Sequence, residues 1–185
     1  VNLVINKLRL KEDLAQKIAA NFECDSASVM DVLNDAETLK RFNVNNNTLM
    51  TIVVPNTYSM LWNASAEKII NKLYSEKEKF WNTERVNKAK ALNLTPEQVY
   101  TMASIVEEET NKEPDKGLIA SVYMNRINTG IKLQADPTVK FAMKNFGLKR
   151  IKHVHLSYDS PFNTYQHAGL PPGPICTPST KTIDA

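Results

Sequence analysis

The residues of this sequence that could do acid–base chemistry gather in one run of three glutamates, Glu107, Glu108 and Glu109. A helix rotates successive residues by about 100°, so the three carboxyls must point in three directions. Glu109 lies about 50° from the centre of the preceding apolar stripe, Glu107 about 110° and Glu108 about 150°. We therefore expect Glu109 to be at least partly buried in a groove and Glu108 to be exposed. Burial and the C-terminal end of the helix dipole would both favour the protonated carboxyl of a general acid. The alternative is an acidic helix end paired with Lys112 or Lys116.

A second group of residues, further along the chain, carries the side chains that a sugar-binding site needs. Its members combine amide, hydroxyl, carboxylate, guanidinium and aromatic groups: Asn125, Arg126, Gln134, Asp136, Thr138, Asn163, Thr164 and Tyr165. Amides pair with sugar hydroxyl and N-acetyl groups, and aromatic faces pack against pyranose rings. Singly, each pattern has a structural alternative: a surface pair, a turn, or a rigid Pro-rich connector or ligand. We expect Asn125, Gln134, Asp136, Asn163 and Tyr165 to converge on the cleft that holds Glu109.

Helix signals show which elements must position these groups. The capping box Thr95-Pro96-Glu97-Gln98 opens a helix that should carry the glutamates and run to about Thr110. Pro114 opens another helix, which should end at Gly130. Its inward residues are expected to be Leu118, Ile119, Val122, Tyr123 and Ile127. After Gly130 the chain favours loops and short elements, with a turn at Asp136-Pro137.

The N-terminal third predicts a small α/β unit. Residues 1–53 are expected to form a strand, two helices and a strand, with the last strand at 51–54 and Ser26 capping the second helix. Ser65 should cap a long helix that follows. The sequence therefore predicts an α+β fold: a mainly helical domain at 54–185 with short strands and long loops, preceded by the βααβ segment 1–53.

Composition excludes several classes of function. The 185 residues carry a net charge of only +3, whereas a nucleic-acid binder would show a denser basic stripe. Cys24 and Cys176 lie far apart without a CxxC pair, which favours free thiols over a disulfide or a zinc site. His153 and His155 lack a third ligand, so we expect no metal, and no Gly-rich phosphate loop follows a strand, so we expect no nucleotide or other cofactor. No apolar run approaches 18 residues and no signal peptide is present, and we expect the chain to be a piece of a longer protein.

Read in order, these motifs resemble the YceG-like family of endolytic murein transglycosylases. The matching segments are 102–110 (MASIVEEET), 120–126 (ASVYMNR), 133–139 (LQADPTV), 163–165 (NTY) and 169–173 (GLPPG). The resemblance is weaker over residues 50–94, and residues 1–50 match only in pattern. One departure is Phe162, where the family usually has Tyr, so a hydroxyl is either dispensable or a substrate contact is lost.

The resemblance implies a catalytic role for Glu109 and substrate-binding roles for the second group of residues named above. It implies cleavage of the bond between N-acetylmuramic acid and N-acetylglucosamine in peptidoglycan, which leaves 1,6-anhydro ends and terminates nascent strands beside cell-wall synthases. It also implies a LysM-like character for residues 1–53 and a YceG-like catalytic domain at 54–185. A single N-terminal helix would anchor the bacterial protein in the inner membrane, with the catalytic part facing the periplasm or cell wall.

Two rival functions stay open. Ordinary glycosidases need two carboxylates, and no second acidic residue has a strong claim here, whereas a lytic transglycosylase needs only one. A non-catalytic module that binds peptidoglycan would keep the amide and aromatic residues without a buried Glu109. An aminodeoxychorismate lyase label attached to this family would require pyridoxal phosphate, and the sequence shows no motif for its Schiff-base lysine or phosphate cradle.

Overall fold

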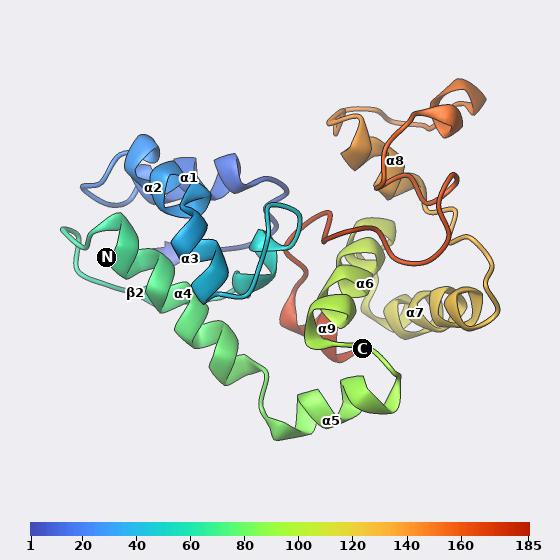
Figure 1. Ribbon diagram of the computed structural model, residues 1–185, viewed down its shortest axis with the longest axis horizontal. Helices are drawn as coiled ribbons and strands as arrows, with labels where there is room; N and C mark the ends of the chain where they lie inside the picture. Colours follow the sequence, from blue (N-terminus) through green and yellow to red (C-terminus); the bar gives the residue numbers. More distant parts are fainter.

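The computed structural model describes all 185 residues, which form two lobes joined side by side (Figure 1). The N-terminal lobe contains β1 (Asn2–Val4), α1 (Lys11–Ala19), α2 (Ser26–Asn34), α3 (Ala36–Arg41), the 3₁₀ helix η1 (Leu49–Ile52), β2 (Thr57–Ser59) and α4 (Ala66–Phe80). The C-terminal lobe contains α5 (Thr83–Ala91), α6 (Pro96–Glu109), α7 (Glu113–Asn128), α8 (Asp136–Ala142), the 3₁₀ helix η2 (His153–Ser157) and α9 (Thr180–Asp184). The fold is thus mainly helical with two short strands. None of the helices is long and apolar enough to cross a membrane.

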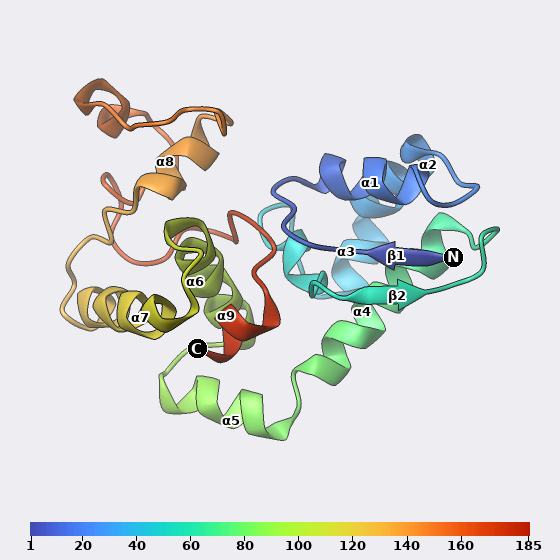
Figure 2. The same cartoon turned by 180° about the vertical axis from the view of Figure 1, so that it is seen from behind.

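One hydrophobic core holds the N-terminal lobe together. Its buried side chains extend from Leu3 to Leu73 without a break at residue 53. β1 pairs antiparallel with β2, which places Leu3 opposite Tyr58 (Figure 2). The unit that the sequence placed at 1–53 therefore needs β2 and most of α4 to complete its core, so the boundary lies later in the chain than expected.

The strand expected at 51–54 is wrong. Leu49–Ile52 form η1, and the strand that pairs with β1 lies beyond Pro55, at Thr57–Ser59. The residues from Leu49 to Val54 are all buried. A short run that is buried on every side has no periodicity by which a helical turn differs from a strand, which explains the error.

Capping chemistry located the longer helices correctly. Ser65 accepts a hydrogen bond from the Lys68 amide at the start of α4. The Thr95 capping box opens α6 as expected. The second helix is capped by Asp25 instead of Ser26, one residue earlier than predicted. Helices α3 and α5 were not expected, and Asp136 begins helix α8 where a turn was predicted.

Helix α6 is the centre of the C-terminal lobe. Its residues from Tyr100 to Val106 are all buried, because α5, α7, α8, α9 and η1 contact it. Tyr100 also reaches the N-terminal lobe, where its hydroxyl donates a hydrogen bond to the Val53 carbonyl oxygen. A helix that is covered on all sides lacks a single apolar stripe, so angular arguments from one stripe are unsafe for it.

Helix α7 covers α6 with a narrower face than the sequence predicted. Tyr123 is buried, as expected, but Leu118 and Val122 are 70% and 50% exposed. Leu118 and Val122 form one i, i+4 row, and Ile119 and Tyr123 form the next row around the helix. Only the second row faces the core, because α7 lies at the outside of the lobe with one neighbouring helix layer (Figure 1).

The segment before α9 joins the two lobes. The Thr177 amide donates to the Leu8 carbonyl oxygen at 2.8 Å, and the Leu8 amide donates to the Thr177 hydroxyl at 2.8 Å. On the other side, the Ile175 amide donates to the Ser104 hydroxyl at 3.0 Å. The backbone of Gly173 packs so closely on the N-terminal lobe that a Cβ there would lie 1.8 Å from the Asn47 carbonyl oxygen.

We predict that Gly173→Ala lowers the free energy of unfolding by about 1–3 kcal/mol, since the new methyl group must push two backbones apart. Gly147→Ala is the matched control, because a Cβ at Gly147 meets nothing within 4 Å. Urea unfolding of the two variants measures the difference. Equal stability of both variants would contradict the close contact between residues 173 and 47.

Candidate active site

Glu109 ends helix α6 with an exposed side chain. The Tyr123 hydroxyl donates a 2.8 Å hydrogen bond to its Oε1 atom, and its Oε2 atom has no hydrogen-bond partner in the chain. The burial predicted for Glu109 is therefore wrong, and so is the exposure predicted for Glu108, whose side chain is only 15% exposed. The carboxyl of Glu109 is held at one oxygen and accessible at the other.

Glu108 and not Glu109 is buried because of the residues on the face of α6 that carries Glu108. Glu108 lies on the same face of α6 as Thr101 and Ser104. These two residues are polar, so the apolar stripe read from the sequence does not include them. Both are buried, and the Ile175 segment covers Ser104, to whose hydroxyl the Ile175 amide donates a hydrogen bond. Small hydroxyl residues can bury a helix face when they pair with a backbone, which a hydrophobic pattern does not register.

Glu108 ties the C-terminal lobe to the N-terminal lobe. The Arg9 guanidinium donates to both of its carboxylate oxygens, with Nε at 3.1 Å and Nη2 at 3.3 Å. Lys7 adds a weaker contact at 3.9 Å. Arg9 also lies over the ring of Phe146, 5.0 Å from its centroid. This bidentate geometry is the strong form of an ion pair, and it uses both carboxylate oxygens of Glu108.

Glu107 is a structural carboxylate within the C-terminal lobe. It accepts hydrogen bonds from Ser179 and Thr182 of the α9 region and pairs with Lys116 of α7 at 3.4 Å. The Lys116 side chain is only 4% exposed. Burial alone would lower the pKa of Lys116, but the carboxylates of Glu113 and Glu107 raise it above its ordinary value. Glu107 therefore neutralises a nearly buried cation.

Two phenols face Glu109 and its surroundings. Burial, followed by the negative charge of Glu109, raises the pKa of Tyr123 well above its ordinary value. Burial and a hydrogen bond to Asp136 raise the pKa of Tyr165 to about 12, and the charge of Glu109 contributes to the same rise. Both phenols thus remain protonated donors near neutral pH, one to Glu109 and the other to Asp136. The positive charge of Arg126 opposes these shifts at both rings.

Some of the residues expected to converge on Glu109 do so. Two of the five, Asp136 and Tyr165, are hydrogen-bonded to each other, and the charge of Glu109 acts on Tyr165. Arg126 was not among the five, but its charge acts on both Tyr123 and Tyr165, and its guanidinium donates to the Leu133 carbonyl oxygen. Gln134 is exposed on the loop between α7 and α8, where its backbone is left-handed with a φ of 52°. The structure therefore brings an acid, two phenols, a second carboxylate and a guanidinium into one polar cluster.

Three other residues of the predicted site do not present their side chains there. Thr138, Asn163 and Thr164 are 0–1% exposed, and all three are bonded within the chain. The Asn163 amide group donates to two carbonyl oxygens and accepts from the Tyr165 amide. The Thr164 hydroxyl accepts from the Ala135 amide and pairs with the Thr138 hydroxyl at 2.8 Å. Direct contact with a glycan, as expected from the sequence, does not fit this placement.

Asn125 lies on a different face of α7. It is two residues from Tyr123 and hence about 160° away around the helix. It lines a cavity of about 390 Å³ that runs between α6, α7 and α9 and is mainly apolar. The expectation that Asn125 converges on Glu109 is wrong for this reason.

The sequence predicts Tyr123 as a core residue and indicates no role for it in the site. A tyrosine on the same helix face as apolar residues is ordinarily core, and its hydroxyl needs a partner when buried. That partner is Glu109, and the run of acids at the end of the preceding helix is the sequence signal that could have indicated it. The chain has no cluster of three His, Cys, Asp or Glu side chains that could hold a metal, and Cys24 and Cys176 are free thiols.

Comparison with known proteins gives consistent matches. The YceG-like family model matches residues 1–185. An endolytic murein transglycosylase of Streptococcus pneumoniae (serotype 2, strain D39 / NCTC 7466) is 32% identical over 139 residues, which cover 71% of this chain and 24% of that protein. The endolytic murein transglycosylase of Bacillus subtilis (strain 168) is 35% identical over 121 residues, 65% of this chain and 33% of that protein.

A solved structure matches the whole fold. The crystal structure of a yceG-like protein from Listeria monocytogenes superposes with a TM-score of 0.85 at 28% sequence identity, covering 100% of this chain and 65% of that one. The chain spans about a quarter to a third of the length of the two transglycosylases it matches.

We predict that Glu107→Gln lowers the free energy of unfolding by about 1–3 kcal/mol, because it leaves the nearly buried Lys116 with one carboxylate partner instead of two. Glu84→Gln is the matched control, since Glu84 pairs with Lys88 at the surface and is 72% exposed. Urea unfolding should leave the control as stable as the parent chain, because an exposed ion pair contributes little. A Glu107 variant as stable as the control would show that this carboxylate does not stabilise the lobe.

Proposed function

This chain belongs to the YceG-like family, and on that premise we propose that it cleaves peptidoglycan glycan strands as an endolytic lytic transglycosylase. The observation that carries the proposal is the state of Glu109: one carboxylate oxygen is held by Tyr123 and the other is free and accessible. A positioned acid on the end of a rigid helix, beside further hydrogen-bonding groups, is the arrangement that general acid–base catalysis requires.

We assign both proton transfers to Glu109. It first protonates the glycosidic oxygen between N-acetylmuramic acid and N-acetylglucosamine, and the bond from that oxygen to the anomeric carbon breaks. The 6-hydroxyl of the muramic residue then attacks the anomeric carbon and returns its proton to the carboxylate. The products are a 1,6-anhydro end and a free hydroxyl, and no water is consumed. Attack within one sugar has a large effective-concentration advantage over attack by a separate molecule.

The exposure of Glu109 suits a polymeric substrate. A bound strand would cover the carboxyl and displace the water around it, so the proton would pass directly between the carboxyl and the strand. Tyr123 would keep the carboxyl oriented while the proton moves, because its own proton is held firmly. Asp136, Tyr165, Arg126 and Gln134 provide the polar groups near the reacting sugar. Thr138, Asn163 and Thr164 are proposed to position these groups from beneath.

A second candidate reaction is hydrolysis, and the position of Asp136 favours considering it. Asp136 is a second carboxylate in the cluster, bonded to Tyr165. A pair of carboxylates on either side of a glycosidic bond is the arrangement of ordinary glycosidases, whose product is a reducing end. The chemical nature of the new end therefore separates the two reactions. A module that binds glycan without cutting it would form neither end.

We also propose four properties of the whole protein. They are a LysM-like character of the N-terminal lobe, a single membrane anchor in a bacterial inner membrane, action on the periplasmic or cell-wall side, and work beside cell-wall synthases on nascent strands. The substrate class is supported by the names of the two transglycosylases that this chain resembles.

We predict that Glu109→Gln abolishes formation of 1,6-anhydro ends while glycan binding and folding persist. The amide keeps the size of the acid but neither donates a proton to the leaving oxygen nor accepts one from the 6-hydroxyl. General acid–base help alone contributes about 10²–10⁴-fold to a rate. Chromatography with mass analysis of digested strands measures the new ends.

Glu108→Gln is the control for this substitution, because Glu108 is occupied by Arg9 and is assigned no proton transfer. It should still form 1,6-anhydro ends, although a modest loss of stability is expected from the weakened ion pair between the lobes. Undiminished anhydro product from the Glu109 variant would refute the single acid–base residue. Reducing ends from the parent chain would favour hydrolysis.

We further predict that Tyr123→Phe lowers kcat about tenfold and leaves KM nearly unchanged, because the lost hydrogen bond orients the acid and does not hold the glycan. Steady-state kinetics on purified strands gives the two parameters, and urea unfolding checks that the ring still packs. A rise in KM at constant kcat would instead place the hydroxyl among the substrate contacts.

A further inference from the structure

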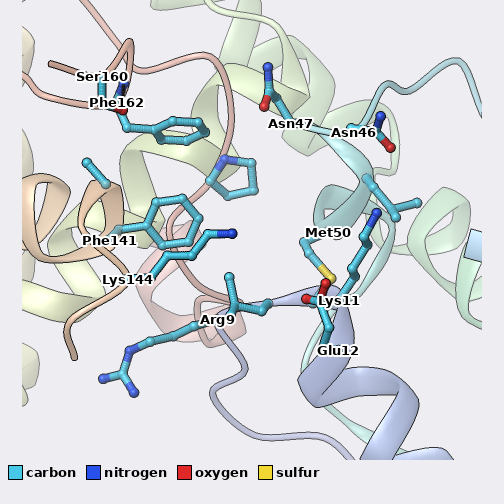
Figure 3. A pocket seen from close by; sticks show the side chains of 14 residues that line it. Arg9, Lys11, Glu12, Asn46, Asn47, Met50, Phe141, Lys144, Ser160 and Phe162 are labelled. Atoms are coloured by element: carbon cyan, nitrogen blue, oxygen red, sulfur yellow. Dashed lines mark hydrogen bonds between the residues drawn. The ribbon is translucent and has the colours of Figure 1, made fainter. Parts of the chain in front are cut away.

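A cavity of about 300 Å³ lies between the two lobes, and none of the groups gathered around Glu109 lines it (Figure 3). One wall belongs to the N-terminal lobe and carries Asn46, Asn47 and Met50. The facing wall belongs to the C-terminal lobe and carries Phe141 and Phe162. The volume lies at the lower end of the range for small-ligand sites, which is about 300–1,000 Å³.

The walls combine an aromatic surface with free amides. The rings of Phe141 and Phe162 are tilted by 50° with centroids 4.9 Å apart, so together they form an angled apolar surface. Asn46 and Asn47 on the opposite wall are exposed, and their side chains make no hydrogen bond within the chain. A sugar needs both features, because its ring face packs on aromatic carbon while its hydroxyl and acetamido groups pair with amides.

The charges in the cavity nearly cancel, which favours a neutral sugar over a polyanion. Arg9 is neutralised by its two hydrogen bonds to Glu108. Lys11 and Glu12 contribute opposite charges to the same wall. Lys144 is the one remaining cation and forms no ion pair. A site for a phosphate-rich polymer would hold several unpaired cations instead.

The cavity is connected to Glu109 by two elements that contribute to both places. Helix α8 carries Asp136 at its start, beside Tyr165, and Phe141 five residues later in the cavity. At about 1.5 Å per helical residue, this separation along the helix is only about 7–8 Å. The loop after η2 likewise carries Phe162 in the cavity and Tyr165 in the polar cluster. Five positions also turn the helix by about 140°, so Asp136 and Phe141 lie on different faces of α8, and a strand held at Glu109 would pass around α8 to reach the cavity.

We propose that this cavity between the lobes binds an N-acetylated hexosamine of the same glycan strand that is cut at Glu109. Phe141 and Phe162 support the face of the ring, and Asn46 and Asn47 hydrogen-bond its substituents. The proposal rests on the proposed function, to which it adds a second binding place away from the bond that breaks. A sugar held there sets the register of the strand over Glu109, so cleavage falls within a strand and not only at its end.

The test is binding of glycan fragments of increasing length to the 185-residue chain carrying Glu109→Gln, in which bound strands are not cut. The probes are purified peptidoglycan glycan strands without stem peptides, separated by length and measured by calorimetry. Two changes are added separately: the double substitution Asn46→Ala with Asn47→Ala, and Phe162→Leu, which keeps apolar volume but removes the ring. Each should weaken binding of long strands roughly fivefold, and short fragments that span only the Glu109 region should be unaffected.

Asn63→Ala is the matched control, because Asn63 is an exposed amide on the N-terminal lobe outside the cavity. It should bind strands of every length as the Glu109→Gln chain does. Unchanged affinity of both cavity variants, or a loss that does not grow with strand length, would overturn the proposal. The proposed function is judged separately, by 1,6-anhydro ends formed when Glu109 is intact, so either conclusion can fail without the other.

Discussion

The end of helix α6 imposes the constraint on which the rest of the structure depends. Three adjacent carboxylates leave the helix about 100° apart and must find three different surroundings. Glu107 turns toward α7 and α9 and neutralises Lys116, and Glu108 turns toward the N-terminal lobe and pairs with Arg9. Glu109 is left with Tyr123 and open solvent. The two structural carboxylates hold the helix end in place from two sides, so the third is a rigidly mounted acid.

The same helix also determines how the lobes meet. Tyr100 bonds to the backbone of the N-terminal lobe, and Ser104 accepts from the segment that in turn pairs with Leu8. These contacts are buried and made mostly by backbone groups, whose loss would leave unsatisfied polar atoms. The walls of the cavity between the lobes therefore keep a fixed relation to Glu109, as a binding place for one long strand requires.

The polar residues of the C-terminal loops divide into two kinds. Asp136 and Tyr165 have their polar ends at the surface, near Glu109. Asn163, Thr164 and Thr138 are buried beneath them, where they join the loop after α7 to the loop after η2. No buried side-chain nitrogen or oxygen in the chain lacks a hydrogen-bond partner. Loops without regular secondary structure obtain their rigidity in this way, and that rigidity is what a binding site built on loops needs.

The sequence by itself determined the helices that begin with strong caps, α4 and α6, the predominance of helix, and the run of acids that ends α6. These features depend on interactions between residues a few positions apart, which a sequence displays directly. Only the tertiary structure decided which acid is exposed, since that depends on Ile175 covering Ser104 and on Arg9 reaching Glu108. It likewise decided that Asn163 and Thr164 are buried, that Asn125 faces away from Glu109, and that the N-terminal core continues through α4. Contacts between residues far apart in the chain produce each of these outcomes, and local periodicity contains no record of them.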